Sequence, residues 1–328
     1  MCGRTACTLA PDALQKACRY CCKRSGAYRE PKWAGGNDGE GDKSNYYPSY
    51  NVCPQNRTPV LVKGNSDDVD RILQTMKWGL IPSWHRGDPS TFGYNMSNAR
   101  LDTLLEKASF KKPMVNGQRC VVLADGFFEW KSVPGSKKQP YFVYFKDGGD
   151  VEGKDGDVKL EGKGITSRLL TMAGLFDVWT SSSQTDDTTP LYSYTIITVD
   201  ASPSIKWLHH RMPAILDGEE AVSRWLDYGE YNTEKALSML TPVDSLSWHP
   251  VSTVVNDARN KREDCVKKID LNSPKPKQET VLTQWLKKSS SKRPPPHPSP
   301  LETAPCKSEH NAPPGDDDDE EPLAKKQK

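Results

Sequence analysis

Residues 119–130, RCVVLADGFFEW, place a long apolar run directly before a polar and aromatic turn. Valine, isoleucine, threonine and aromatic side chains are enriched in β-strands, so we predict a buried strand here. Near its end, Glu129 stands between Phe128 and Trp130. A carboxyl held against aromatic rings loses solvation, which favours its protonated form and suits general acid–base chemistry. A glutamate that points outward from the end of a strand explains the same residues.

The rest of the chain contains further segments with strand or helix character. Strand composition recurs at residues 58–63, 140–146, 168–179, 192–200 and 248–255. Helical spacing of apolar residues occurs at residues 11–22, 217–228 and 232–240. Because strands and helices do not alternate regularly, a doubly wound parallel sheet is disfavoured. We predict an α+β domain with a mixed, largely antiparallel, barrel-like sheet and flanking helices.

The composition of the chain, which has 328 residues, changes near residue 271. Residues 1–270 contain the strand and helix signals and are long enough for one large domain or two small ones. Residues 271–328 are rich in proline and charged side chains, with runs such as KRPPPHPSP and DDDDEE. Such a segment cannot bury enough apolar surface to fold alone. We predict one folded domain over 1–270 and a disordered tail over 271–328.

One amphipathic segment, QETVLTQWLKK, interrupts this tail at residues 278–288. It resembles a PCNA-interacting peptide over 278–286 because Gln278, Val281 and Trp285 occupy the expected spacing. Gln284 stands where that motif has its first aromatic residue, so we expect modest affinity for PCNA. A short motif that binds nothing is the alternative.

Charge and cysteine content limit the class of protein. The formal net charge is only +2, so any nucleic-acid surface must be a local patch. The nine cysteines are odd in number and irregularly spaced, and no secretory or membrane-spanning segment is apparent. We therefore expect free thiols in a reducing, intracellular compartment. The segment ACRYCC fits apolar helix positions better than a zinc site, and we predict no metal and no cofactor.

Three polar segments, at 35–45, 147–164 and 181–189, are rich in glycine, aspartate or serine. This composition predicts surface loops. We expect the first two to lie away from any functional site.

The chain begins MCGRTACTLA, with a cysteine directly after Met1. If Met1 is removed, Cys2 carries a free α-amine and a thiol on adjacent carbons, a pair that reacts with aldehydes. On these ten residues alone, chance is the favoured explanation for the position of Cys2.

Two further segments carry candidate functional residues. MKWGLIPSW at 76–84 contains Trp78 and Trp84, which suit either a hydrophobic core or a platform on which nucleic-acid bases stack. YNMSNAR ends in Asn98 and Arg100. An amide can orient a substrate or an amine, and a guanidinium suits a phosphate.

IKWLHHRMPAIL at 205–216 brings His209, His210 and Arg211 together directly after a predicted strand. Histidine exchanges protons near pH 7. Two adjacent histidines in a loop point in different directions, so we assign one to chemistry and one to structure.

These motifs, CGR, WGLIPSW, SNAR, ADGFFEW and HHRMPAIL, occur in order across residues 2–257. In this order they resemble the SRAP family, the SOS response-associated peptidases. The resemblance implies one mixed α/β domain with a positively charged groove for single-stranded DNA. It also implies loss of Met1 and a covalent crosslink between Cys2 and abasic sites.

The resemblance also implies roles for individual residues. Asn98 senses the abasic site, Glu129 is the catalytic acid and base, and His209 is the catalytic histidine. The residues implied to contact DNA are Arg4, Trp78, Arg100 and Arg211. Two of these, Arg4 and Arg211, are also expected to lower the pKa of the Cys2 thiol. We expect a nuclear monomer that acts on chromatin at replication forks, shields the lesion and removes its own Met1.

Two alternative functions remain at this point. A thiol peptidase would use Cys2 to cleave other chains and would need a peptide groove. A non-covalent reader of modified cytosine would use the aromatic segments and would bind DNA without Cys2. Only the crosslinking hypothesis explains why the cysteine stands at position 2.

Overall fold

The computed structural model describes residues 2–23, 25–35, 41–66, 69–92, 96–132, 135, 137–146, 168–181 and 189–272. The chain separates into two units, Met1–Ser273 and Pro274–Lys328, and all described residues belong to the first. The predicted PCNA-interacting motif at 278–286 lies outside the described residues, as does residue 1.

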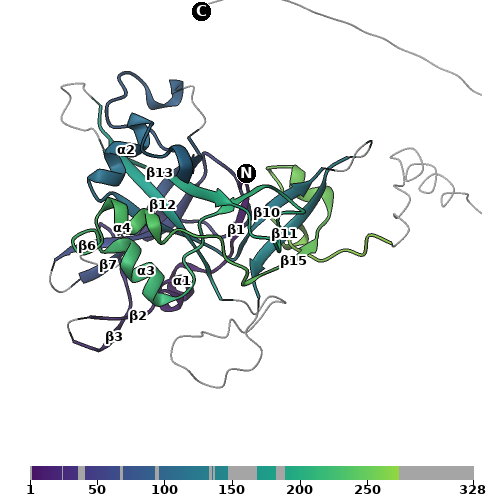
Figure 1. The fold of residues 1–328 in the computed structure, drawn as a ribbon, viewed down its shortest axis with the longest axis horizontal. Helices are drawn as coiled ribbons and strands as arrows, with labels where there is room; N and C mark the ends of the chain where they lie inside the picture. The colour runs from purple at the N-terminus through teal and green to yellow at the C-terminus, as the bar shows by residue number, and fades with distance from the viewer. Residues whose placement is uncertain are drawn as a thin grey trace, which may run out of the picture. The chain divides into compact units, whose positions relative to one another are not determined.

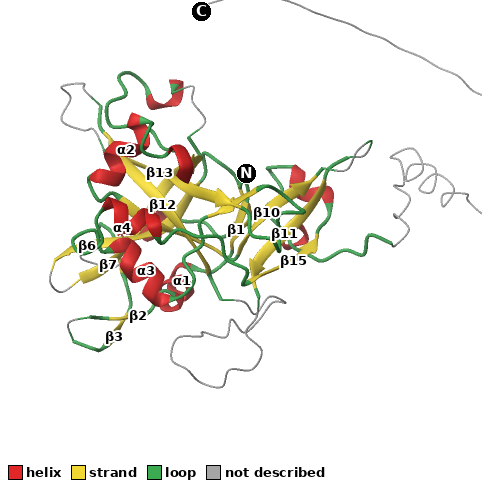
Figure 2. Cartoon of the chain, viewed as in Figure 1, coloured by secondary structure: helices red, strands yellow, loops and turns green. Residues whose placement is uncertain are grey.

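The larger of two main sheets has eight strands (Figures 1 and 2). In spatial order, its strands are β14 (Arg211–Pro213), β13 (Leu191–Asp200), β12 (Leu170–Trp179), β9 (Arg119–Ala124), β6 (Arg57–Ser66), β7 (Val69–Trp78) and β4 (Lys32–Trp33), with β8 (Asn98–Arg100) paired to β13.

Strand β13 closes part of this sheet into a ring. It pairs antiparallel with β12 on one side and parallel with β7 on the other, where Tyr194 is opposite Trp78. The remaining neighbours in the ring, β12 with β9, β9 with β6 and β6 with β7, are all antiparallel. The predicted mixed, largely antiparallel, barrel-like sheet is therefore confirmed.

The smaller sheet has five strands, and short helices pack around both sheets. Its strands, in spatial order, are β15 (Leu246–Pro250), β11 (Gln139–Phe145), β10 (Gly126–Lys131), β1 (Thr5–Cys7) and β5 (Ser49–Val52). A separate hairpin joins β2 (Tyr20–Cys21) to β3 (Tyr28–Arg29), and the α-helices are α1 (Pro11–Ala17), α2 (Ala108–Val115), α3 (Glu219–Leu226) and α4 (Thr233–Ser238).

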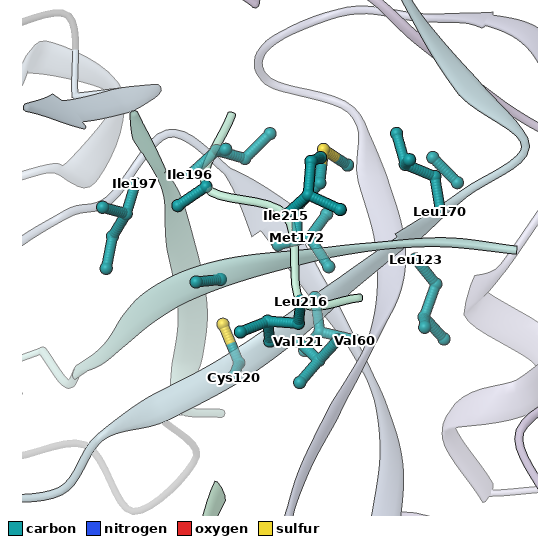
Figure 3. Packing of buried hydrophobic residues seen from close by; sticks show 14 of the residues in the cluster. Val60, Cys120, Val121, Leu123, Leu170, Met172, Ile196, Ile197, Ile215 and Leu216 are labelled. Carbon is teal, nitrogen blue, oxygen red and sulfur yellow. The ribbon is translucent and has the colours of Figure 1, made fainter. Parts of the chain in front are cut away.

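The hydrophobic core is centred on the strands of the ring (Figure 3). All six residues of β9 are buried, which requires cover on both faces of the strand. Helix α3 supplies cover on one side, where the buried Trp225 donates its indole N–H to the carbonyl of Cys120 at 2.9 Å. Burying a side chain of this size is a large favourable contribution to folding.

Residues 119–130 connect the two sheets. The prediction of one strand over 119–130 was wrong, because β9 ends at Ala124 and β10 begins at Gly126 in the other sheet. Asp125 occupies the corner between them. Its N–H donates to the carbonyl of Ala6 at 2.7 Å, and its carboxylate accepts the N–H of Thr8 at 2.9 Å. The corner therefore also fixes the N-terminal strand.

Gly126 is needed at this corner because a neighbouring strand approaches it closely. A Cβ atom at this position would lie 2.4 Å from the carbonyl oxygen of Val143 and 2.6 Å from the ring of Phe142. We expect Gly126→Ala to lower the free energy of unfolding by about 1–3 kcal/mol, measured by urea denaturation. Gly229→Ala, where the Cβ meets only ordinary contacts, is the matched control. Equal stability of the two variants would contradict this account.

Asp125 makes stability depend on pH. Burial raises its pKa to about 6, so the folded state holds the proton more tightly than the unfolded chain. The stabilising contribution is complete below the unfolded value near 4 and is lost as the pH rises through 6. Asp125→Asn keeps an acceptor for Thr8 but does not titrate. We expect the unfolding free energy of the wild type to fall relative to this variant by roughly 2–3 kcal/mol between pH 4 and 7. Parallel pH profiles would refute this expectation.

Some elements differ from the sequence predictions. Strand β7 was not predicted, because its apolar residues are separated by polar ones such as Arg71, a buried side chain that pairs with Glu219. Helix α2 was also missed. Helix α1 ends at Ala17 rather than at residue 22. The predicted strand at 248–255 is β15 followed by a 3-10 turn at Thr253–Asn256.

The predicted loops fall mostly outside the described residues. All of 147–164 does, together with 36–40 and 182–188, while Gly41–Asn45 forms a 3-10 turn. Every cysteine in the described part of the chain is a free thiol. Within that same part, no helix combines the length and apolar character needed to cross a bilayer.

Candidate active site

Cys2 lies where the two sheets meet, and hydrogen bonds from both sheets hold the backbone of the first residues of the chain. On the side of the smaller sheet, the N–H of Phe128 in β10 donates to the carbonyl of Arg4 at 2.8 Å. On the side of the larger sheet, the Nδ2 group of Asn98 in β8 donates to the carbonyl of Cys2 at 2.7 Å. Figure 1 shows β1, β10 and the end of β13 near the amino terminus. The start of the chain is thus fixed in the structure rather than frayed.

The thiol of Cys2 is buried, with 1% of the residue exposed. Burial, and after it the negative charge of Glu129, raise the pKa of this thiol to about 12. The predicted lowering by the charges of Arg4 and Arg211 is outweighed: of these two residues, only Arg4 lowers this pKa, through a backbone hydrogen bond, and its effect is small beside that of burial. Both guanidinium groups are engaged elsewhere: that of Arg4 donates to Asn51 and Val255, and that of Arg211 to Asp200 and Thr198. Near neutral pH the thiol is protonated and needs a base before it can react.

Glu129 is buried in β10, opposite Tyr141 of β11, with 6% of the residue exposed. One carboxylate oxygen accepts the N–H of Trp130 at 3.2 Å. The negative charge of Glu129 acts on the pKa of two other groups, the Cys2 thiol and the imidazole of His209. The carboxylate therefore lies within electrostatic reach of both, which is the placement that a shared proton donor and acceptor requires.

His209 is partly buried and is the inner member of the histidine pair. Its ring stacks on that of His210 at 4.3 Å, and His210 is exposed. Nδ1 of His209 lies 3.0 Å from the backbone nitrogen of Arg211 and 3.1 Å from the carbonyl oxygen of the same residue, so the backbone of Arg211 fixes the orientation of the ring. Burial lowers the pKa of His209, and the carboxylate of Glu129 opposes this shift. A lowered pKa keeps the imidazole neutral at physiological pH.

Asn98 presents a second polar atom in addition to the donor that binds Cys2. Its Oδ1 is buried and has no hydrogen-bond partner among the described residues. A buried carbonyl oxygen without a partner costs free energy unless a substrate or another group supplies a donor. Asn98 is thus a candidate acceptor directly beside the start of the chain.

Two of the four predicted DNA contacts are not available in the structure. Trp78 is fully buried, stacks on Tyr194 and donates its indole N–H to the carbonyl of Ser97, so it is a core residue with no surface for a base. The side chain of Arg211 is only 4% exposed and pairs with Asp200. Its guanidinium also pairs with Asp102, while its buried Nε has no hydrogen-bond partner among the described residues.

The other two predicted DNA contacts lie closer to solvent. The side chain of Arg100 is half exposed and pairs with Asp102. The guanidinium of Arg4 is partly buried and lies 5.8 Å from the ring centroid of Trp130. In Arg100 the bonds to Asp102 use Nε and Nη2, and in Arg4 the bonds to Asn51 and Val255 use Nη1.

Sequence reasoning missed the residue that holds Arg4. Asn51 is fully buried, accepts from Arg4 through Oδ1 and donates through Nδ2 to the carbonyls of Val255, Asp257 and Asn260. An asparagine within a short strand carries no signal of such a role. The 255–260 segment and Arg4 are thereby fixed together beside Cys2.

No group of three histidine, cysteine, aspartate or glutamate residues is arranged to hold a metal ion in the part of the chain that the structure describes. The chemistry of the site is therefore discussed in terms of the thiol, carboxylate, imidazole and amide groups alone.

The chain combines a barrel-like sheet with a buried cysteine at position 2, within electrostatic reach of a carboxylate. A comparison with protein families identifies a match. The family model described as SOS response associated peptidase (SRAP) covers residues 1–258. The chain belongs to the SRAP family, as its motifs predicted.

Individual relatives are similar over most of their length. Abasic site processing protein HMCES of Xenopus tropicalis is 45% identical over 307 residues, which cover 89% of this chain and 87% of that protein. Abasic site processing protein YoqW of Bacillus subtilis is 34% identical and covers 66% of this chain and 84% of its own. A crystal structure of a Bacteroides thetaiotaomicron protein superposes with a TM-score of 0.55 at 27% identity, over 70% of this chain and 88% of that chain.

Proposed function

We propose that this chain traps abasic sites in single-stranded DNA as a covalent crosslink through Cys2. The observation that carries the proposal is the placement of residue 2, which is bound by Asn98 and lies within electrostatic reach of Glu129. Relatives named as abasic site processing proteins support the choice of lesion. The ring-opened sugar of an abasic site carries an aldehyde, and an aminothiol is a specific partner for that group.

The first bond forms between nitrogen and carbon. After Met1 is removed, the α-amine of Cys2, with an ordinary pKa of about 8, is partly neutral at physiological pH. It adds to C1′ of the aldehyde, and loss of water gives an imine. The unpartnered Oδ1 of Asn98 is suited to accept an N–H from this amine. As the sugar opens, the carboxylate of Glu129 accepts the proton of the C1′ hydroxyl and donates it to the ring oxygen, and the same group transfers protons during the loss of water.

The second bond forms between sulfur and the same carbon. Because the raised pKa keeps the Cys2 thiol protonated, a base must accept its proton as sulfur attacks the imine carbon. The proton passes through Glu129 or His209 to the imine nitrogen, so the ring closes without net charge. The product is a five-membered thiazolidine. Because the closure is intramolecular, its effective concentration is high. A lysine imine has no such step and hydrolyses readily. His209 also stabilises the imine stage and assists elimination of the 3′-phosphate.

Removal of Met1 is part of the same proposal. We assign it to the protein itself, with Cys2 as nucleophile and Glu129 and His209 as proton carriers. Intact-mass analysis distinguishes this route from an aminopeptidase. Self-removal predicts that Glu129→Gln and His209→Ala retain Met1 when expressed in the same host. Loss of Met1 in both variants would assign the step to the host enzyme.

The proposal extends to the cellular setting. We expect a monomer in the nucleus, on chromatin at replication forks, where the crosslink shields the lesion and PCNA is a partner through Gln278, Val281 and Trp285. The relevant experiment compares co-precipitation of PCNA by the full chain and by Trp285→Ala. Equal recovery of PCNA would remove that partner.

The deciding experiment uses a uracil-containing single-stranded oligonucleotide treated with uracil glycosylase. We expect the wild-type chain to form an adduct that survives a denaturing gel and maps by mass spectrometry to Cys2. An adduct on an internal lysine would overturn the proposal. Inhibition by a peptide aldehyde without any DNA adduct would also overturn it and would indicate a peptidase. DNA binding that is unchanged in Cys2→Ala and leaves no adduct would indicate a non-covalent reader instead.

A further inference from the structure

Three aromatic side chains beside the candidate site have no part in the chemistry described so far. The rings of Trp207 and Tyr141 meet edge to face, with centroids 5.0 Å apart and an interplanar angle of 85°. The ring of Trp248 lies 5.8 Å from that of Trp207. Trp207 is 39% exposed, whereas Tyr141 is buried. We call these three residues the aromatic ledge. Tryptophan is costly to expose, so an exposed ring in a fixed aromatic setting points to a binding surface.

The ledge borders the catalytic residues on two sides. Tyr141 is the cross-strand partner of Glu129 in the β10–β11 pair. Trp207 stands two residues before His209, whose backbone N–H donates to the carbonyl of Ile205 at 3.3 Å. The position of Trp207 is therefore tied to that of the imidazole. A nucleic-acid base bound on the aromatic ledge would therefore lie next to the part of the strand that reacts at Cys2.

The charge around the ledge suits a polyanion. The Nζ atom of Lys131, from the same strand as Glu129, lies 4.8 Å from the centroid of the Trp207 ring. Lys206 directly precedes Trp207 in the sequence and is exposed. A lysine on an exposed ring is a weak and exchangeable contact, whereas a phosphate offers that lysine a full ion pair.

We propose that the aromatic ledge stacks the base that adjoins the abasic site, while Lys131 leaves the Trp207 ring for a phosphate of the same strand. The inference rests on the proposed function and adds the residues that seat the flanking nucleotide. An abasic site leaves its neighbouring base without one stacking partner, and an exposed indole replaces that partner regardless of sequence. Trp207 thus takes the stacking role that the buried Trp78 cannot fill. It is a positioning residue that does not touch the reacting atoms.

Binding is tested separately from the chemistry with a tetrahydrofuran abasic analogue in a fluorescent single strand, which has no aldehyde and cannot crosslink. By fluorescence anisotropy, we expect Trp207→Ala to raise the Kd about 5- to 150-fold, the range of one base stacked on an aromatic ring. Trp207→Phe should recover most of that loss. With a natural abasic oligonucleotide below saturation, we expect the rate of crosslinking by Trp207→Ala to fall by about the same factor as its binding to the analogue.

Tyr228→Ala is the matched control, because Tyr228 is 48% exposed and carries Lys63 at 4.7 Å but lies after α3, outside the elements of the site. A Kd of Trp207→Ala equal to that of this control would overturn the inference. Photocrosslinking of the wild type to 5-iododeoxyuridine beside the analogue is independent of how any variant folds. It should map to Trp207, and a map to any segment away from the ledge would overturn the inference.

The two proposals fail in different ways. If Trp207→Ala binds normally while the wild type still crosslinks natural abasic DNA through Cys2, only the ledge is refuted. If the wild type forms no adduct but Trp207→Ala weakens binding to the analogue, the crosslinking function is refuted and the ledge is retained.

Discussion

Cys2→Ser should reduce the yield of heat-stable adduct at least about 100-fold, while leaving an adduct that borohydride can trap. The variant keeps the α-amine and still forms an imine. A hydroxyl is a much poorer nucleophile than a thiol, so the ring-closing step that makes the product durable is lost, together with its intramolecular advantage. The measurement is a denaturing gel after heating, with and without cyanoborohydride during the reaction.

Two controls make this result specific to residue 2. Both proteins are first treated with methionine aminopeptidase, because Cys2→Ser lacks the nucleophile proposed for self-removal, and intact mass must show that Met1 is absent, because a retained methionine blocks the amine. Cys21→Ser removes an exposed free thiol elsewhere in the chain and should leave the adduct unchanged. An undiminished heat-stable adduct from Cys2→Ser would show that the thiazolidine account is incorrect.

Glu129→Gln should slow crosslinking by about 10²- to 10⁴-fold, the usual contribution of a positioned acid–base residue. Glutamine keeps the size and polarity of the side chain but cannot carry the proton between sulfur and nitrogen. The measurement is the single-turnover rate at saturating protein, after added methionine aminopeptidase has removed Met1 from the variant and intact mass has verified its loss. A rate equal to that of the wild type would exclude Glu129 from the chemistry.

The same variant has a second expected effect that a purely structural role would not produce. Because the charge of Glu129 raises the pKa of the Cys2 thiol, its removal should lower that pKa, measured as the pH dependence of alkylation of Cys2. It should also lower the pKa of His209, whose protonated form Glu129 favours. Glu220→Gln, an exposed carboxylate paired with Arg224, should change neither value nor the rate.

Local context indicated the candidate site residues only in part. Glu129 stands among aromatic residues and Cys2 follows Met1, but each context also fits a structural role or chance, and the predicted roles rest on the motifs that resemble the SRAP family. Their convergence could not be predicted from spacing, because it depends on β1 pairing with β10 and on the bond from Asn98 to the carbonyl of Cys2.

Aromatic residues show the limit of sequence reasoning most directly. Trp78 and Trp207 are the same residue type in similar mixed segments, yet one is fully buried and the other 39% exposed. The difference arises from the parallel pairing of β13 with β7, which places Trp78 opposite Tyr194. Such a non-local pairing leaves no mark within either segment.

The predicted continuous strand at 119–130 failed for a related reason. Both halves have strand composition, and composition does not report a change of sheet at a single residue. Within this segment, Gly126 is the residue that the corner requires, because the structure leaves no room there for a Cβ atom.

The hydrogen bonds that join Asn51 to Arg4 and to residues 255–260 have a consequence for biosynthesis. During translation, the amino end leaves the ribosome first, whereas residues 255–260, one of the groups that fix Arg4, are among the last parts of the domain to emerge. The nascent chain therefore lacks this support for Arg4 until nearly the whole domain has been made. Self-removal of Met1 would then be a post-translational event, completed only in molecules that have folded to the end.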